Sequence, residues 1–233
     1  MAFFALLCAS CTAQISGSLK GDGQADLLLY AALEPWTTTL IERFSAIQPG
    51  PSSTLIDGPA IAESMSSAPG IESVSLKNIA PAAIQGPIKI SRITDFLTGG
   101  KRLSVRSPDF ITFTQGKPPA GGRFTISIDR FSGPKILNLI SPEVGEYLSA
   151  LMAPVATGEA LTKADYLDLV GSLYGKNIAD EISRALIRAY IDFPGKIQSA
   201  KGGTFSGRRA EFAVPLLDLL VVEKTLTYEV VWK

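Results

Sequence analysis

The sequence predicts an α+β fold: one mainly antiparallel, curved sheet, with about three helices inserted between its strands. Two observations lead to this prediction. In residues 123–130 and in the last strand of the chain, apolar and polar residues alternate at period two, which is typical of half-buried strands. Residues 141–187 instead place apolar residues at helical spacing, and we expect this helical insert to pack on one face of the sheet.

The first part of the chain is expected to form a hairpin followed by helices. Residues 15–32 contain two strand-like segments joined by the turn sequence Gly21-Asp22-Gly23. Residues 35–48 predict a helix, because proline suits the first helical position and apolar residues then recur on one face. A short helix is predicted at residues 59–66, capped by Asp57, and a strand follows it.

The clearest strand alternation lies in residues 123–130, where Phe124, Ile126 and Ile128 alternate with polar side chains. Together with residues 109–114, this segment predicts a second hairpin.

Three helix starts are visible in the insert. Ser141 precedes a proline and an acidic residue, which is a typical helix beginning. Thr162 and Asp165 have the spacing of a capping box. Asn177 opens the third predicted helix.

The tail of the chain is predicted to be rich in strands. Across a turn at Gly202-Gly203, residues 188–200 and 204–214 are expected to pair, with a break at Pro194-Gly195. Residues 215–222 fit either a short helix or an extended apolar segment. The last strand places Trp232 on its apolar face, so the chain is expected to end inside its sheet.

Composition argues against several classes of function. The chain has 22 basic and 22 acidic residues and no histidine. A balanced charge without a basic stripe argues against nucleic-acid binding. Without histidine, the commonest general base and most zinc sites are excluded. The acidic pairs, such as Asp165 with Asp168, suit helix caps and exposed faces. We therefore predict no catalytic residue, no metal site, no cofactor and no enzymatic activity.

Both cysteines, Cys8 and Cys11, lie in an apolar leader that ends in small residues, AFFALLCASC. This leader resembles the end of a bacterial lipoprotein signal peptide, in which the cysteine is lipidated and becomes the first mature residue. It departs from that pattern at Cys8, where leucine is usual, and in having no basic residue before the apolar run. A buried first strand and a frayed apolar terminus are the alternative interpretations.

The lipoprotein resemblance implies how the chain is organised. Residues 1–10 would be a signal peptide, expected to be longer at its start, and residues 11–233 a single domain. Acyl chains on Cys11 would anchor this domain to a membrane, in the cell envelope, facing the periplasm or the cell surface.

The tail carries a second resemblance. The sequence IDFPGKIQSAKGG of residues 191–203, followed by Phe205-Ser206-Gly207, resembles the C-terminal pattern of LppM-like bacterial lipoproteins. Residues 17–27 resemble their first hairpin. The chain departs from them at the Lys201-Gly202 turn, where asparagine is more usual, and in the insert of residues 141–187. The resemblance implies an envelope-facing α+β domain that can hold a cavity for a lipid-like ligand, and it implies no catalytic residues.

Two hypotheses of function follow. In the first, the protein is an anchored module that binds an apolar, lipid-like ligand, and the candidate lining residues are Phe124, Ile126, Leu148, Leu151, Tyr166 and Leu173, each of which also fits an ordinary core. In the second, it is a structural or interaction lipoprotein without a small ligand, whose exposed loops contact an envelope protein. A closed apolar cavity of at least ~300 Å³ would favour the first hypothesis.

Overall fold

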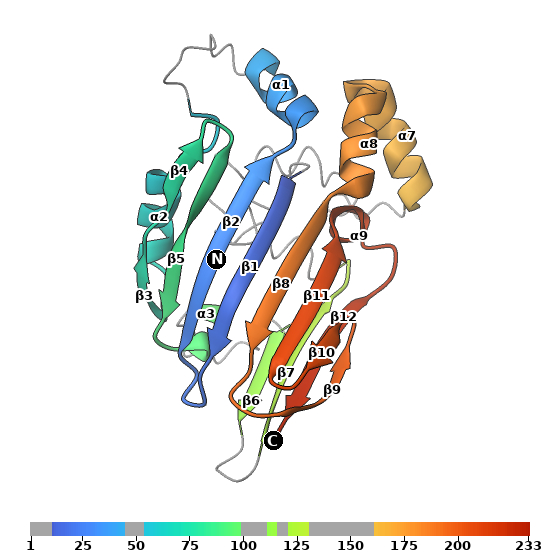
Figure 1. Cartoon of the computed structure of the whole chain (residues 1–233). Helices are drawn as coiled ribbons and strands as arrows, with labels where there is room; N and C mark the ends of the chain where they lie inside the picture. Colours follow the sequence, from blue (N-terminus) through green and yellow to red (C-terminus); the bar gives the residue numbers. More distant parts are fainter. Residues whose placement is uncertain (1–10, 45–53, 99–110, 116–120, 131–160) are drawn as a thin grey trace.

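The computed structural model describes residues 11–44, 54–98, 111–115, 121–130 and 161–233. These residues form two β-sheets, with short helices at the sheet ends and behind the larger sheet (Figure 1). The chain is therefore α+β, as the sequence predicts.

The larger sheet contains eight strands. Their bounds are β1 Cys11–Leu19, β2 Ala25–Leu33, β3 Ile71–Val74, β4 Lys77–Ala80, β5 Ala83–Ile90, β8 Leu186–Asp192, β10 Thr204–Ser206 and β11 Arg209–Pro215. The order is β10-β11-β8-β1-β2-β5-β3, and β4 also pairs with β5. In this sheet β1 and β8 run parallel, and the other described pairs are antiparallel. The first strand of the domain thus lies beside the strand that follows the helical insert.

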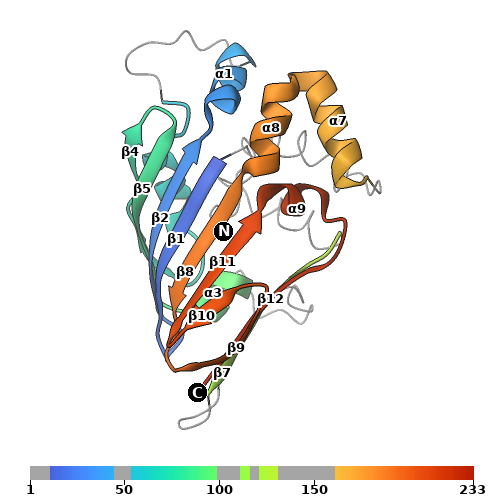
Figure 2. The ribbon, with the colours of Figure 1, turned by 45° about the vertical axis from the view of Figure 1, so that its right-hand side comes forward.

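The smaller sheet is a feature that the sequence analysis did not predict. It consists of β6 Ile111–Gln115, β7 Gly122–Ile128, β9 Ile197–Lys201 and β12 Leu226–Trp232, in the order β6-β7-β12-β9 and antiparallel throughout. The predicted hairpin of residues 109–130 is its β6–β7 pair. Two sheets form because residues 193–196, around the predicted Pro194-Gly195 break, carry the chain from β8 to β9. Figure 2 shows the sheets at an angle, closest together near this crossover.

The described helices are α1 Pro35–Phe44, α2 Gly58–Ser66, α3 Ile93–Thr98, α7 Lys163–Tyr174, α8 Lys176–Arg184 and α9 Leu216–Val221. The predicted caps Asp57 and Thr162 are confirmed, whereas the helix predicted to open at Asn177 begins at Lys176, after Gly175. Asp57 accepts a hydrogen bond from the Ala60 amide at 3.0 Å, and Thr162 and Asp165 form a capping box at the start of α7. The ambiguous segment 215–222 forms α9, a short helix between β11 and β12.

The described part of the helical insert lies at one end of the larger sheet rather than on its face (Figures 1 and 2). There α7 and α8 contact each other, and both contact α9. The helix predicted from Ser141 lies outside the described residues. For α7 and α8 this differs from the expected position on one face of the sheet, because periodicity shows that a helix buries one face but not which element covers that face.

An aromatic cluster fills the space between the sheets. Phe193, at the crossover, has its ring centroid 5.1 Å from that of Trp232 on β12 and 6.4 Å from that of Phe124 on β7. Phe113 on β6 stacks on Trp232 at 6.1 Å. Phe193 and Trp232 are almost fully buried, so the prediction that the chain ends inside its sheet is confirmed.

Candidate functional site

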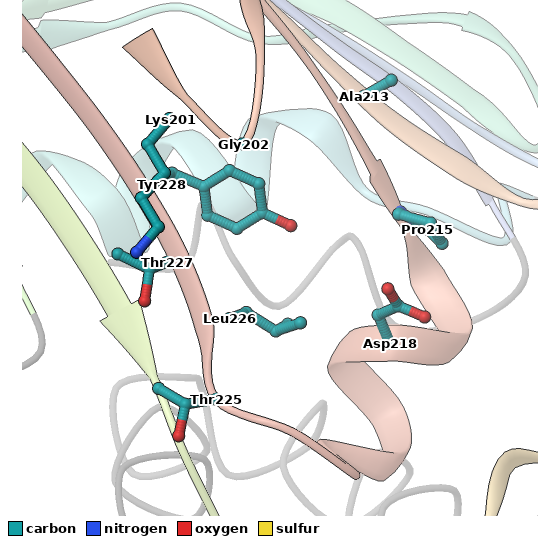
Figure 3. A pocket seen from close by; sticks show the side chains of 9 residues that line it. All are labelled: Lys201, Gly202, Ala213, Pro215, Asp218, Thr225, Leu226, Thr227 and Tyr228. Atoms are coloured by element: carbon teal, nitrogen blue, oxygen red, sulfur yellow. The ribbon is translucent and has the colours of Figure 1, made fainter.

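A cleft of about 440 Å³ opens where the two sheets diverge (Figure 3). It is lined by residues from the end of β9, the end of β11, α9 and the start of β12, namely Lys201, Gly202, Ala213, Pro215, Asp218, Thr225, Leu226, Thr227 and Tyr228. The cleft is open to solvent and its lining is polar as well as apolar, so it differs from the closed apolar cavity of at least ~300 Å³ that would favour the first hypothesis.

One wall of the cleft is α9. Its apolar residues Leu216, Leu217, Leu219, Leu220 and Val221 are all buried, which leaves Asp218 as its polar side chain. Figure 3 shows Asp218 directed from the helix toward the cleft. Lys163, the first residue of α7, holds this carboxylate through an ion pair of 2.5 Å between Nζ and Oδ1. The helical insert therefore fixes a charged group of the cleft.

A strained turn connects α9 to the opposite wall. Val222 is buried and left-handed, with φ 47° and ψ 48°, a conformation that is unfavourable for a β-branched residue. Its carbonyl accepts a hydrogen bond from Arg130 Nε at 3.2 Å. This turn brings the chain back along the cleft as β12.

The opposite wall is the inner face of β12. Leu226 and Tyr228 extend from this strand into the cleft (Figure 3). The Tyr228 ring contacts Phe212 of β11 edge-to-face, with centroids 5.9 Å apart. Burial raises the pKa of the Tyr228 phenol, and the negative charge of Asp218 raises it further. The phenol therefore stays neutral at physiological pH and can donate and accept hydrogen bonds.

The lining combines apolar and polar groups. Pro215, Leu226 and the Tyr228 ring supply apolar surface, and the Tyr228 phenol and the Asp218 carboxylate supply polar contacts. The side chains of Lys201 and Thr227 lie on the opposite face of the smaller sheet from Tyr228. Among the nine lining residues there is no histidine, cysteine or serine. This arrangement suits the binding of a molecule that has both an apolar and a polar part.

None of the predicted ligand-binding residues that the structure describes lines the cleft. Phe124 and Ile126 share the inner face of β7: Ile126 lies opposite Tyr228 in the β7–β12 pair, and Phe124 belongs to the aromatic cluster around Phe193. Tyr166 is buried in α7 with 1% of its surface exposed. Leu173, near the end of α7, is 65% exposed. Leu148 and Leu151 lie outside the described residues.

Leu173 is therefore reassigned from the candidate pocket to the surface. Helix α7 has two apolar stripes: Tyr166 and Val170 face inward, whereas Leu169 and Leu173 face outward. Helical spacing alone does not show which stripe is buried.

Sequence reasoning missed Asp218 and Tyr228. The only local signal was Asp218, a single acidic residue within the apolar run of residues 215–222. Its significance depends on β9, β11 and β12 meeting in space, which no local pattern shows.

Cys11, the predicted lipidation site, is the first residue of β1 and pairs with Leu33 at the end of β2. The neighbouring Thr12 donates a hydrogen bond to Glu34 at 2.7 Å between Oγ1 and Oε1. Cys11 therefore lies at the sheet end where α1 begins.

In the described residues, no helix has the length and apolar character needed to cross a membrane, and no acidic or cysteine cluster could hold a metal ion.

Comparison with known proteins gives one structural likeness. No family model and no curated protein matches the chain. The structure is similar to that of the folded domain of the LppM protein of Mycobacterium tuberculosis, with a TM-score of 0.43 and 9% sequence identity, over 96% of this chain and 90% of that one. At this level of similarity we transfer no residue, ligand or activity from LppM.

Proposed function

We propose that the protein is a membrane-anchored lipoprotein of the cell envelope that binds an amphiphilic, lipid-like ligand in the cleft between the sheets without performing chemistry on it. The observation that supports this proposal is the cleft of about 440 Å³, in which the apolar side chains of Pro215 and Leu226 meet the phenol of Tyr228 and the carboxylate of Asp218. A ligand with an alkyl part and a polar head would match both kinds of surface.

The cleft supports binding more than catalysis. Asp218 already has a charged partner, because its Oδ1 lies 2.5 Å from Lys163 Nζ. The raised pKa of Tyr228 keeps its phenol protonated, so it is suited to hydrogen bonding rather than to nucleophilic attack. These groups can orient a polar head without reacting with it.

The ligand proposal is tested by native mass spectrometry of the purified full chain. We expect a co-purified fatty acid or phospholipid. Leu226→Trp, which places an indole where the Leu226 side chain extends into the cleft, should abolish this species. Leu28→Trp is the matched control, because Leu28 is an exposed leucine on β2 that does not line the cleft. Equal ligand occupancy in both variants, or no bound lipid in the wild type, would favour the alternative of a structural or protein-interaction lipoprotein.

The anchor gives a separate prediction. Cys11→Ala should release the protein from the membrane fraction into the soluble envelope fraction, because acyl chains supply most of the membrane affinity of such an anchor. Cys8→Ala is the matched control and should leave the protein in the membrane fraction. Fractionation followed by intact-mass measurement checks both results, and a wild-type chain whose intact mass includes no acyl group contradicts acylation at Cys11.

A further inference from the structure

The position of Cys11 leaves no linker between the proposed anchor and the folded domain. Strand β1 begins at Cys11 itself, paired with Leu33, and the hydrogen bond from Thr12 to Glu34 holds the next residue. An acyl chain on Cys11 would therefore bring this end of the larger sheet within side-chain reach of the bilayer.

Three helices lie at this same end. Helix α1 begins two residues after Leu33, and α8 ends two residues before β8, which runs parallel to β1 and starts beside it. Helix α8 contacts both α1 and α7. We call the surface formed by α1, α7 and α8 the helical end; it is at the top of the molecule in Figures 1 and 2.

The helical end exposes large apolar side chains. Trp36 on α1 is 49% exposed, and Leu169 and Leu173 on α7 are 44% and 65% exposed. Leu169 and Leu173 are four residues apart and so form one outward stripe of their helix. Trp36 is held in place, because its backbone amide donates a hydrogen bond to the buried Glu181 carboxylate of α8 at 2.8 Å.

The charges of the helical end do not suit the binding of anionic groups. The described charged residues of α7 and α8 have both signs: the acids are Asp165, Asp168, Asp180 and Glu181, and the bases are Lys163, Lys176 and Arg184. This surface therefore has no excess of basic residues, and its exposed tryptophan and leucines are instead typical of contact with the interfacial layer of a bilayer.

We propose that the helical end lies against the lipid bilayer, with Trp36, Leu169 and Leu173 in the interfacial layer. This inference rests on the proposed function, since the anchor at Cys11 determines which end faces the membrane. The cleft then lies near the membrane as well, because α9, which forms one of its walls, contacts α7 and α8.

The two tryptophans make this inference testable by fluorescence. Trp36 is 49% exposed, whereas Trp232 is 3% exposed and lies in the core. The full chain would be reconstituted into vesicles of phosphatidylethanolamine and phosphatidylcholine, with and without phosphatidylcholine brominated on its acyl chains. We expect a blue shift of the emission and quenching by the brominated lipid, at low and at high salt. Trp36→Phe should remove the quenching and leave the Trp232 emission unquenched.

A second measurement tests the leucines without the anchor. In the Cys11→Ala chain, Leu169→Ser with Leu173→Ser should weaken partitioning into the same vesicles about tenfold, because two apolar side chains no longer enter the lipid. Leu28→Ser with Ile79→Ser is the matched control, since these side chains are 42% and 54% exposed on β2 and β4, and it should leave partitioning unchanged.

The outcomes separate this inference from the anchor. If the protein is acylated but Trp36 is quenched by aqueous iodide and not by brominated lipid, the inference is refuted and the anchor remains supported. Protein that carries no acyl group by intact mass refutes the anchor. If that unacylated chain still binds vesicles with Trp36 quenched, the inference stands; if it does not bind, the inference falls too.

Discussion

Replacing Trp232 with alanine is expected to lower the free energy of unfolding by about 3–5 kcal/mol, as truncation of a large buried aromatic side chain usually does. Trp232 is 3% exposed and connects three parts of the molecule. Its ring contacts Phe113 of β6 and Phe193 of the crossover, with centroids 6.1 Å and 5.1 Å away. Removal of the Trp232 ring should therefore weaken the packing between the two sheets as well as the packing of β12 itself.

The surroundings of Trp232 cannot easily close over the space that it leaves. Its indole occupies the volume above Gly122, its partner on β7, where an added Cβ would lie 2.2 Å from Trp232 Cζ2. A glycine has no side chain to fill a cavity, and cavity volume adds to the cost of truncation.

Chemical denaturation of the wild type and of Trp232→Ala measures this effect. Phe205→Ala is the matched control, because Phe205 is an aromatic residue on a strand but is 44% exposed. Its substitution should change stability by about 1 kcal/mol or less. An unchanged denaturation midpoint for Trp232→Ala would show that the end of β12 does not pack as described.

The second large effect is expected for Glu181→Ala, with a loss of about 2–4 kcal/mol, because hydrogen bonds to a buried charged group contribute more than neutral ones. Glu181 on α8 is 5% exposed and caps the beginning of α1 from another helix. Its Oε1 accepts from the Trp36 amide at 2.8 Å, and its Oε2 accepts from the Thr37 amide at 3.0 Å and the Thr37 hydroxyl at 3.1 Å. The alanine would leave these donors at the N-terminus of α1 without this acceptor.

Asp180→Ala is the control for Glu181→Ala, because Asp180 is the adjacent acid on the same helix but is exposed. Glu181→Gln keeps one acceptor oxygen and should give an intermediate loss. Thermal unfolding followed by circular dichroism measures all three variants. A loss for Asp180→Ala as large as that for Glu181→Ala would mean that general charge effects, not the cap of α1, explain the result.

Local sequence signals predicted most of the described elements. The capping residues Asp57 and Thr162 start α2 and α7 as expected, and the Gly21-Asp22-Gly23 turn joins β1 to β2. These signals are reliable because a cap or a tight turn depends on atoms only two to four residues apart. The buried end of β12 followed in the same way from alternation at period two.

The candidate site could not be predicted in this way. Ile126 was predicted to line a ligand pocket but is not among the residues that line the cleft, Asp218 and Tyr228 were not recognised, and Leu173 was placed inside although it is exposed. A polar side chain in a strand or a short helix has the same local pattern whether it faces a cleft or open solvent.

The sequence by itself determined the α+β class, the turns and caps, and the apolar faces, since all of these follow from short-range sterics, hydrogen bonding and periodicity. Tertiary structure alone decided that β1 pairs with β8, that β9 leaves the larger sheet for the smaller one, and that Glu181 reaches across to cap α1. The physical reason is that strand pairing and side-chain burial depend on which distant surfaces meet, and one amphipathic face can be covered by several different partners.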